Sequence, residues 1–369
     1  MSTQSHPSST DQPGTQAREV DPDRLDELLG RIIGDLGGTI SAGLVVIGDE
    51  LGIYAAMRGG DPVSTEELAE RTDTSPVYLS PWLANQAAGG YIQYDRETGL
   101  WSMTPEQEAA LADPDSPAFF TGSMQLALAA LRDVPTIKDR FRSGQGFGWH
   151  EHDSLLFTGT ERFFRPGYAA NLVDSWLPAL EGITEKLDQG INVLDVGCGH
   201  GASTILMAQH FPRSRFVGVD YHEGSIVMAR RRAEEAGVAD RVTFEVGDAA
   251  DLPVRAAGLV TMFDCLHDMG DPDGAARAVR RSLTDDGTFM LVEPMAGDHI
   301  EDNLHPIGRV FYGASTLVCT PSSLAQPGQR ALGPQAGPAV LTSMLKDASF
   351  SRVRVATTTP VNLVIEARP

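Results

Sequence analysis

Val193-Leu194-Asp195-Val196-Gly197-Cys198-Gly199-His200-Gly201 is an apolar run that ends in three alternating glycines. The apolar residues predict a buried strand, and a helical pattern over 202–211 follows the glycines. Because glycine has no β-carbon, backbone N–H groups and the start of that helix can approach a ligand closely. The next predicted strand, 215–219, ends in Asp220, a carboxylate placed to bind ribose hydroxyls. Together these features predict a site for a nucleotide-like cofactor.

Two cofactors fit this pattern. Gly197, Gly199 and Ala202 match the spacing of the dinucleotide fingerprint, which favours NAD. Asp195 lies two residues before the first glycine and favours S-adenosylmethionine, because a carboxylate there could receive an ammonium group but would repel a pyrophosphate. We therefore expect S-adenosylmethionine, with an NAD oxidoreductase as an alternative.

Two further predicted strands end in segments that complete the site. Residues 242–246 lead into 247–253, which resembles the loop that cradles adenine in class I methyltransferases, so the resemblance assigns Asp248 to the exocyclic amine. Residues 259–264 lead into Cys265-Leu266-His267-Asp268-Met269-Gly270-Asp271-Pro272. This segment resembles the His-Asp segment of small-molecule O-methyltransferases of plants and actinobacteria, except that Met269 replaces their usual aromatic residue.

The resemblance extends from about residue 40 to residue 369 and includes uncharacterised bacterial methyltransferases with a winged-helix front domain. It implies an α/β fold, a Rossmann-like class I methyltransferase domain with a seven-stranded sheet and an antiparallel last strand, preceded by a helical winged-helix domain. Strands at 352–357 and 362–367 would form the edge hairpin. The expected cofactor-binding residues are Asp195, Gly197, Cys198, Gly199, Gly201, Asp220, Tyr221, Gly247, Asp248, Ala249 and Asp264.

The implied reaction is methyl transfer to a hydroxyl or amine of a small molecule. His267 is the expected general base, since its ordinary pKa suits proton removal near neutral pH. Asp268 orients the substrate or caps the helix at Pro272, and Glu293 fixes the imidazole tautomer or is a solvated strand end. Carbon methylation or ring closure in natural-product biosynthesis is an alternative outcome in the same fold.

The composition bears on partners and compartment. The 369 residues suffice for two domains. A formal net charge of −21 would repel nucleic acid and anionic membranes. The three scattered cysteines favour a reducing cytoplasm, and we find no uninterrupted apolar run long enough to span a membrane. Residues 1–20 include a polar stretch rich in Ser, Gln, Pro and Thr, which we expect to be a disordered tail.

Residues 21–113 predict a winged-helix domain. The predicted elements are, in order, two helices over 21–57 broken near Gly37-Gly38, a helix after the capping residue Ser64, a helix over 76–88 and a hairpin of 91–94 with 100–103. Residues 76–90 contain no Lys or Arg, which disfavours DNA binding. A regulator that binds S-adenosylmethionine and reads DNA is a further alternative. The resemblance instead implies a dimerisation domain and a homodimer.

We expect residues 114–189 to form a helical linker and substrate lid, and residues 190–369 to form the catalytic domain. The glycine-rich loop 144–153 contains Trp149, His150 and His152, and the next helix places Phe164, Tyr168 and Asn171 on one face. Together with Tyr312 and Thr316, which follow the fifth predicted strand of the catalytic domain at 288–293, these are the expected substrate residues. His150 and His152 could ligate a metal, but no matching carboxylate cluster follows the fourth strand, so we expect no metal.

Overall fold

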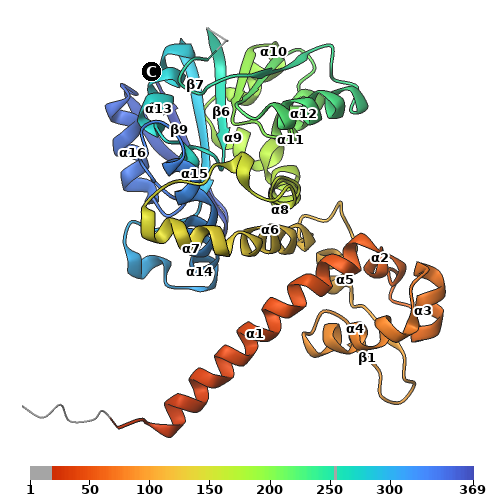
Figure 1. Ribbon diagram of the computed structural model, residues 1–369. Coiled ribbons are helices and arrows are strands. Elements are labelled where there is room, and N and C mark those ends of the chain that lie inside the picture. The colour runs from red at the N-terminus through yellow and green to blue at the C-terminus, as the bar shows by residue number, and fades with distance from the viewer. Residues whose placement is uncertain (1–18, 253–255) are drawn as a thin grey trace, which may run out of the picture.

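The computed structural model describes residues 19–252 and 256–369. Residues 1–18 of the expected tail, and Pro253 of the expected adenine loop, lie outside the described residues. The N-terminal domain and the sheet domain are separate bodies in Figure 1, with helices α6 and α8 between them.

The N-terminal domain contains the predicted helices and hairpin. Its elements are α1 (Pro22–Glu50), α2 (Ile53–Ala56), α3 (Thr65–Thr72), α4 (Pro76–Ala88), β1 (Gln93–Tyr94), β2 (Trp101–Ser102) and α5 (Pro105–Leu111). Ser64 begins α3, as predicted, because its hydroxyl accepts the N–H of Glu67. Tyr54, Leu68 and Leu83 are buried at the centre of this domain, so it has a core of its own.

Helix α1 is continuous, and the predicted break at Gly37-Gly38 is wrong. A glycine inside a helix costs about 1 kcal/mol relative to alanine but keeps its N–H donor. A proline would remove that donor and clash with the preceding turn, but α1 contains no proline after Pro22, its first residue. The helix therefore continues through both glycines.

The N-terminal half of α1 extends away from the rest of the N-terminal domain (Figure 1). Its exposed apolar residues are Leu25, Leu28, Leu29, Ile32, Ile33, Leu36 and Ile40. By length and composition, α1 is the one helix among the described residues that could span a membrane. Its apolar residues are interrupted by polar and charged ones, so the sequence has no uninterrupted apolar run here. However, Asp35 and Asp49 in α1 form ion pairs of 2.6 Å with Arg309 and Arg162. These pairs connect α1 to the rest of the chain.

The linker is helical, as predicted. It contains α6 (Thr121–Arg132), α7 (Val134–Ser143), the 3-10 turn η1 (Trp149–Glu151), α8 (Leu155–Asn171), the π-turn η2 (Leu172–Trp176), α9 (Leu177–Ala179) and α10 (Ile183–Gln189). Helices α6 and α8 pack against each other, and Gly159 allows their backbones to approach, since a Cβ there would lie 2.5 Å from the Leu126 nitrogen. We call α6, η1 and α8 the helical cap.

The C-terminal half is built on a seven-stranded sheet with the order β5-β4-β3-β6-β7-β9-β8. Its strands are β3 (Asn192–Val196), β4 (Arg215–Asp220), β5 (Val242–Val246), β6 (Ala257–Phe263), β7 (Leu283–Pro294), β8 (Arg352–Thr358) and β9 (Asn362–Arg368). Among these strands, β9 runs antiparallel to both of its neighbours, β7 and β8, and all the other pairs are parallel. The predicted fold class, including the antiparallel last strand, is confirmed.

Helices cover both faces of this sheet (Figure 1). The covering helices include α11 (Ala202–His210), α12 (Glu223–Glu235), α13 (Pro272–Ser282) and α16 (Gly337–Asp347). Consecutive residues of a strand point to opposite faces, so Val193 joins one apolar core and Leu194 the other. The excursion after β7 forms η4 (Ile300–Asn303), α14 (Pro306–Ala314), the π-turn η5 (Ser315–Cys319) and α15 (Thr320–Leu324). Burial on both faces explains why the central strands are mostly apolar.

Candidate active site

A cavity of about 510 Å³ lies at the carboxyl ends of β3, β4 and β6. Val196 and Phe263, the last residues of β3 and β6, and Val219, the next-to-last residue of β4, line it. The glycine turn after β3 forms one wall, and helix α8 of the cap forms another. In an open α/β sheet this edge is where ligands bind.

The glycines of the turn have different surroundings. Gly197 and Gly199 line the cavity with φ angles of +73° and +52°, which L side chains rarely adopt. A Cβ on Gly199 would meet no atom within 4 Å, so this glycine faces open space. Gly201 is absent from the cavity wall, and a Cβ there would lie 2.6 Å from the ring of Phe244. Gly201 is therefore packed against Phe244 at the base of the turn, and its expected contact with the cofactor stays a prediction.

Asp195 also lies behind the cavity wall. It is 1% exposed, and its carboxylate accepts hydrogen bonds from the hydroxyls of Ser203, Thr204 and Thr261 at 2.7, 2.5 and 2.8 Å. Burial raises the pKa of this carboxyl. The expectation that Asp195 receives an ammonium group directly is therefore corrected, because its oxygens face these hydroxyls and not the cavity.

The other expected cofactor residues line the cavity: Cys198, Asp220, Tyr221, Gly247, Asp248, Ala249 and Asp264. The Asp220 carboxylate accepts the N–H of Gly199 and the N–H of His222, both at 2.9 Å. These two bonds fix the carboxylate at the end of β4. The ring of His222 stacks on Phe157 of α8 at 4.5 Å, which joins the cap to this end of the cavity.

The charged groups of the wall have one sign. Its carboxylates are Glu161, Asp220, Asp248, Asp264, Asp268 and Asp271. Within the described part of the chain, no Lys or Arg lines the cavity. A pyrophosphate would meet like charges here, whereas a sulfonium or ammonium group would meet opposite charges. The donor set therefore fits a cationic nucleoside better than NAD.

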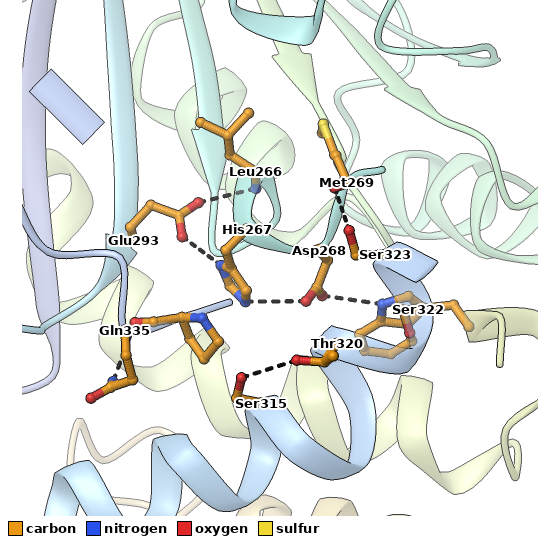
Figure 2. A network of polar contacts seen from close by, with 12 residues as sticks. Leu266, His267, Asp268, Met269, Glu293, Ser315, Thr320, Ser322, Ser323 and Gln335 are labelled. Atoms are coloured by element: carbon orange, nitrogen blue, oxygen red, sulfur yellow. Dashed lines mark hydrogen bonds and ion pairs between the residues drawn. The ribbon is translucent and has the colours of Figure 1, made fainter. Parts of the chain in front are cut away.

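His267, Asp268 and Glu293 form a buried network at the end of β6 (Figure 2). His267 Nδ1 lies 2.5 Å from Glu293 Oε2, and His267 Nε2 lies 3.3 Å from Asp268 Oδ1. Burial would lower the pKa of His267, but Glu293 and Asp268 outweigh burial and raise this pKa well above its ordinary value. The imidazole therefore bridges two carboxylates.

Only Asp268 of this network reaches the cavity wall. Its Oδ2 accepts the indole N–H of Trp149 at 3.1 Å, and Trp149 lines the cavity from η1. His267 is 4% exposed and lies behind Asp268, so its predicted role as general base stays a prediction. His267, Asp268 and Cys319 also bring one potential metal ligand each within 4.8 Å of one another, although His267 already contacts both carboxylates.

Asp264 is a second buried carboxylate in the wall. It follows β6 in a left-handed conformation with φ of +50°, and it accepts hydrogen bonds from Tyr168 at 2.9 Å and from Asn362 at 3.2 Å. Burial, aided by the charge of Glu293, raises its pKa to about 8. At pH 7 this group is therefore mostly a neutral acid.

The expected substrate residues divide into two groups. Trp149, Phe164 and Tyr168 line the cavity. The remaining five lie outside this wall and stay predictions: His150 is exposed, His152 bonds to Asp133, Asn171 bonds to Gly167 of its own helix, Tyr312 is absent from the wall, and Thr316 lines a different cavity beside α7. A shared helix face predicts Phe164 and Tyr168 well, but the helix changes to a π-turn immediately after Asn171. His150 and His152 do not converge on a common point.

Sequence reasoning missed Phe157, Glu161, Gln326 and Pro327, all of which line the cavity. Gln326 donates to the Asp268 carbonyl at 2.9 Å and accepts the N–H of Gly270 at 3.1 Å. This contact joins positions 58 and 56 residues apart in the chain, so no local pattern indicates it. For Phe157 and Glu161 the helical spacing with Phe164 was a usable signal.

Comparison with known proteins agrees with this geometry. Residues 187–331 match the family model of a methyltransferase domain, and residues 39–113 match an Rv2258c-like winged HTH domain. The chain has a methyltransferase domain. The winged-helix prediction is confirmed for its N-terminal part.

Curated relatives match part of the chain over part of their own length. The 27-O-demethylrifamycin SV methyltransferase of Amycolatopsis mediterranei is 31% identical over 156 residues, which are 40% of this chain and 56% of that protein. The demethylmenaquinone methyltransferase of Symbiobacterium thermophilum is 33% identical over 107 residues, which are 28% of this chain and 43% of that protein. The chain thus spans about half the length of these relatives.

Solved structures share the whole fold at low sequence identity. Human N-acetylserotonin methyltransferase in complex with SAM has a TM-score of 0.68 and 17% identity, over 96% of this chain and 99% of that one. Mitomycin 7-O-methyltransferase has a TM-score of 0.65 and 18% identity, over 95% and 100%. The cap and the winged-helix part therefore belong to the same architecture as the methyltransferase domain.

Proposed function

We propose that the chain is an S-adenosylmethionine-dependent methyltransferase that acts on a hydroxyl or amine of a small organic molecule. One observation supports this proposal above all: a single cavity with acidic walls contains the glycine turn, the Asp220 carboxylate and Asp268. The match to a methyltransferase domain supports the same reaction class. The likeness to a structure that contains SAM supports the choice of cofactor.

Gly197, Gly199, Asp220 and Asp248 would hold the cofactor. Gly199 leaves open space where a side chain would stand, and Asp220 is already fixed by two N–H groups for contact with ribose. When bound, S-adenosylmethionine supplies an electrophilic methyl group on a sulfonium. The residues of the chain must then position the acceptor and take up its proton.

The proton leaves the acceptor through the His267 network. Asp268 is the member at the cavity wall, so it accepts the proton as the acceptor oxygen or nitrogen takes the methyl group. His267 holds the Asp268 carboxylate in place, and Glu293 holds His267. We thus assign to Asp268 the proton acceptance that the sequence predicts for His267. His267 acts as a positioning residue behind Asp268.

Binding and product analysis test the proposal. Titration calorimetry with S-adenosylhomocysteine should detect binding to the full chain, and NAD should give none. Incubation with S-adenosylmethionine and a panel of phenols, alcohols and amines should give a product heavier by one CH₂. Binding of NAD without S-adenosylhomocysteine would refute the proposal. A product methylated at carbon, or a cyclised product of unchanged mass, would establish the alternative outcome.

The role of Asp268 has its own test. Asp268→Asn should lower kcat on the acceptor found in that panel by about 10²-fold to 10⁴-fold, the range of general-base catalysis. Its affinity for S-adenosylhomocysteine should stay within about twofold. The exposed Asp285→Asn is the matched control and should behave as wild type. Unchanged turnover in Asp268→Asn would remove this carboxylate from the mechanism.

The acceptor class follows from the wall. Trp149, Phe157, Phe164 and Tyr168 face the cavity, and such rings favour a flat, partly apolar acceptor. The relatives named after rifamycin, erythromycin and nocamycin support an acceptor from secondary metabolism. We place the enzyme in the cytoplasm, where S-adenosylmethionine is made and used.

We also propose a homodimer that forms through α1, and no contact with nucleic acid. The exposed apolar residues of α1 form a face that the rest of the described chain leaves uncovered. Ile33→Glu, at a residue 68% exposed, should convert a dimer to a monomer in light scattering. Val227→Glu, at a residue 59% exposed on α12, should leave the dimer intact. A wild-type monomer, or a shift of a DNA duplex in a gel, would contradict this part.

A further inference from the structure

One carboxylate of the cavity comes from outside the sheet domain. Glu161 lies on α8 of the helical cap, and its side chain is 10% exposed. Its Oε1 lies 2.6 Å from Arg232 Nη1 on α12, and its Oε2 lies 3.6 Å from Nδ1 of His200 in the glycine turn. Glu161 therefore faces the cavity beside the glycine turn and connects the cap to the methyltransferase domain.

Glu161 keeps its negative charge in this position. Burial would raise its pKa, but the contacts with His200 and Arg232 outweigh burial and hold the pKa at about 2. Asp264 differs, because its pKa of about 8 makes it mostly neutral at pH 7. Asp195 differs as well, because three hydroxyls surround it behind the wall. Asp220 already accepts two backbone N–H groups at the ribose end.

We propose that Glu161 binds the ammonium group at the amino-acid end of S-adenosylmethionine. This inference rests on the proposed function and assigns a residue to the contact that the sequence led us to expect from Asp195. A carboxylate held by Arg232 has a fixed direction, and its bond to an ammonium is charge-assisted. Because Glu161 belongs to α8, the bound amino-acid end also fastens the cap over the cavity.

Titration calorimetry on Glu161→Gln tests this contact with three ligands. S-adenosylhomocysteine should bind roughly 10-fold to 100-fold more weakly than to wild type, the usual loss for a hydrogen bond to a charged group. Decarboxylated S-adenosylmethionine, which keeps the ammonium, should weaken in parallel. 5′-Methylthioadenosine, which has the nucleoside but no amino-acid end, should change by less than about twofold. Glu161→Asp, which keeps the charge, should recover part of the affinity.

Glu234→Gln is the matched control, because Glu234 is an exposed residue of α12, and it should bind all three ligands as wild type does. The proposal is overturned if Glu161→Gln binds S-adenosylhomocysteine normally or loses 5′-methylthioadenosine to the same extent. It is also overturned if Asp264→Asn, and not Glu161→Gln, shows the selective loss. Failure of wild type to bind any of these nucleosides would instead refute the proposed function.

Discussion

The two sides of the cavity differ in how they are assembled. The cofactor side consists of strand ends and the short segments that follow them, such as 197–201 after β3 and 247–250 after β5. The acceptor side combines Trp149, Asp268 and Gln326, which come from separate parts of the chain and meet through side-chain bonds. A local motif can therefore specify a cofactor site, whereas an acceptor site depends on long-range contacts.

The largest expected effect is on the cofactor side, where the base of the glycine turn is tightly packed. Gly201→Ala would place a Cβ 2.6 Å from the ring of Phe244 at a φ of +81°. Overpacking and left-handed strain together should lower the free energy of unfolding by about 2–4 kcal/mol. Urea denaturation measures this loss. Gly167→Ala is the control, because a Cβ there meets nothing within 4 Å and α8 gains a better helix former.

Gly199→Ala should affect binding more than folding. Its Cβ would meet no atom of the chain, so only the strain at a φ of +52°, about 1–2 kcal/mol, should appear in urea denaturation. The methyl group would enter the open space at the turn, and the affinity for S-adenosylhomocysteine should fall by about tenfold or more in calorimetry. Equal stability losses in the two glycine variants would contradict the distinction between them.

Asp264 makes the boundary between the two sides sensitive to pH. Its pKa is raised to about 8 in the folded chain from an ordinary value of 3.8. The neutral form therefore contributes stability that is fully present below pH 3.8 and is lost as the pH rises through 8. The free energy of unfolding of wild type minus that of Asp264→Asn should fall between pH 5 and pH 8.5. A flat difference across a series of urea titrations would contradict the raised pKa.

The smallest expected effect concerns the acceptor side. Trp149→Phe keeps an aromatic ring but removes the indole N–H that Asp268 Oδ2 accepts. One lost bond to a charged group should cost about 1.5–3 kcal/mol at most, and water that enters the cavity will reduce the cost. We expect kcat on the acceptor to fall while the affinity for S-adenosylhomocysteine stays within about twofold. Steady-state kinetics and calorimetry on the same preparation separate the two.

The sequence predicts much of the fold because strands and helices follow local periodicity. All seven strands of the sheet and the order of the cofactor segments follow from apolar runs and the residues that end them. The break in α1 was wrong because two glycines alone do not end a helix. At the site, local patterns place Asp195, Gly201 and His267 in the chain but do not show where their side chains point. The Asp195 and His267 side chains are buried, and a Cβ on Gly201 would point at the ring of Phe244.

Two neighbouring residues of α8 make that helix a joint. Glu161 pairs with Arg232 of the methyltransferase domain, and Arg162 pairs with Asp49 near the end of α1. Asp35 pairs with Arg309 of α14, so α1 is held to the rest of the chain at a second point, roughly 20 Å from Asp49 at 1.5 Å per residue. Two anchors so far apart fix the direction of the helix, and a tilt of α8 alone would have to break one of them. The apolar face of α1 therefore keeps a set orientation relative to the cavity.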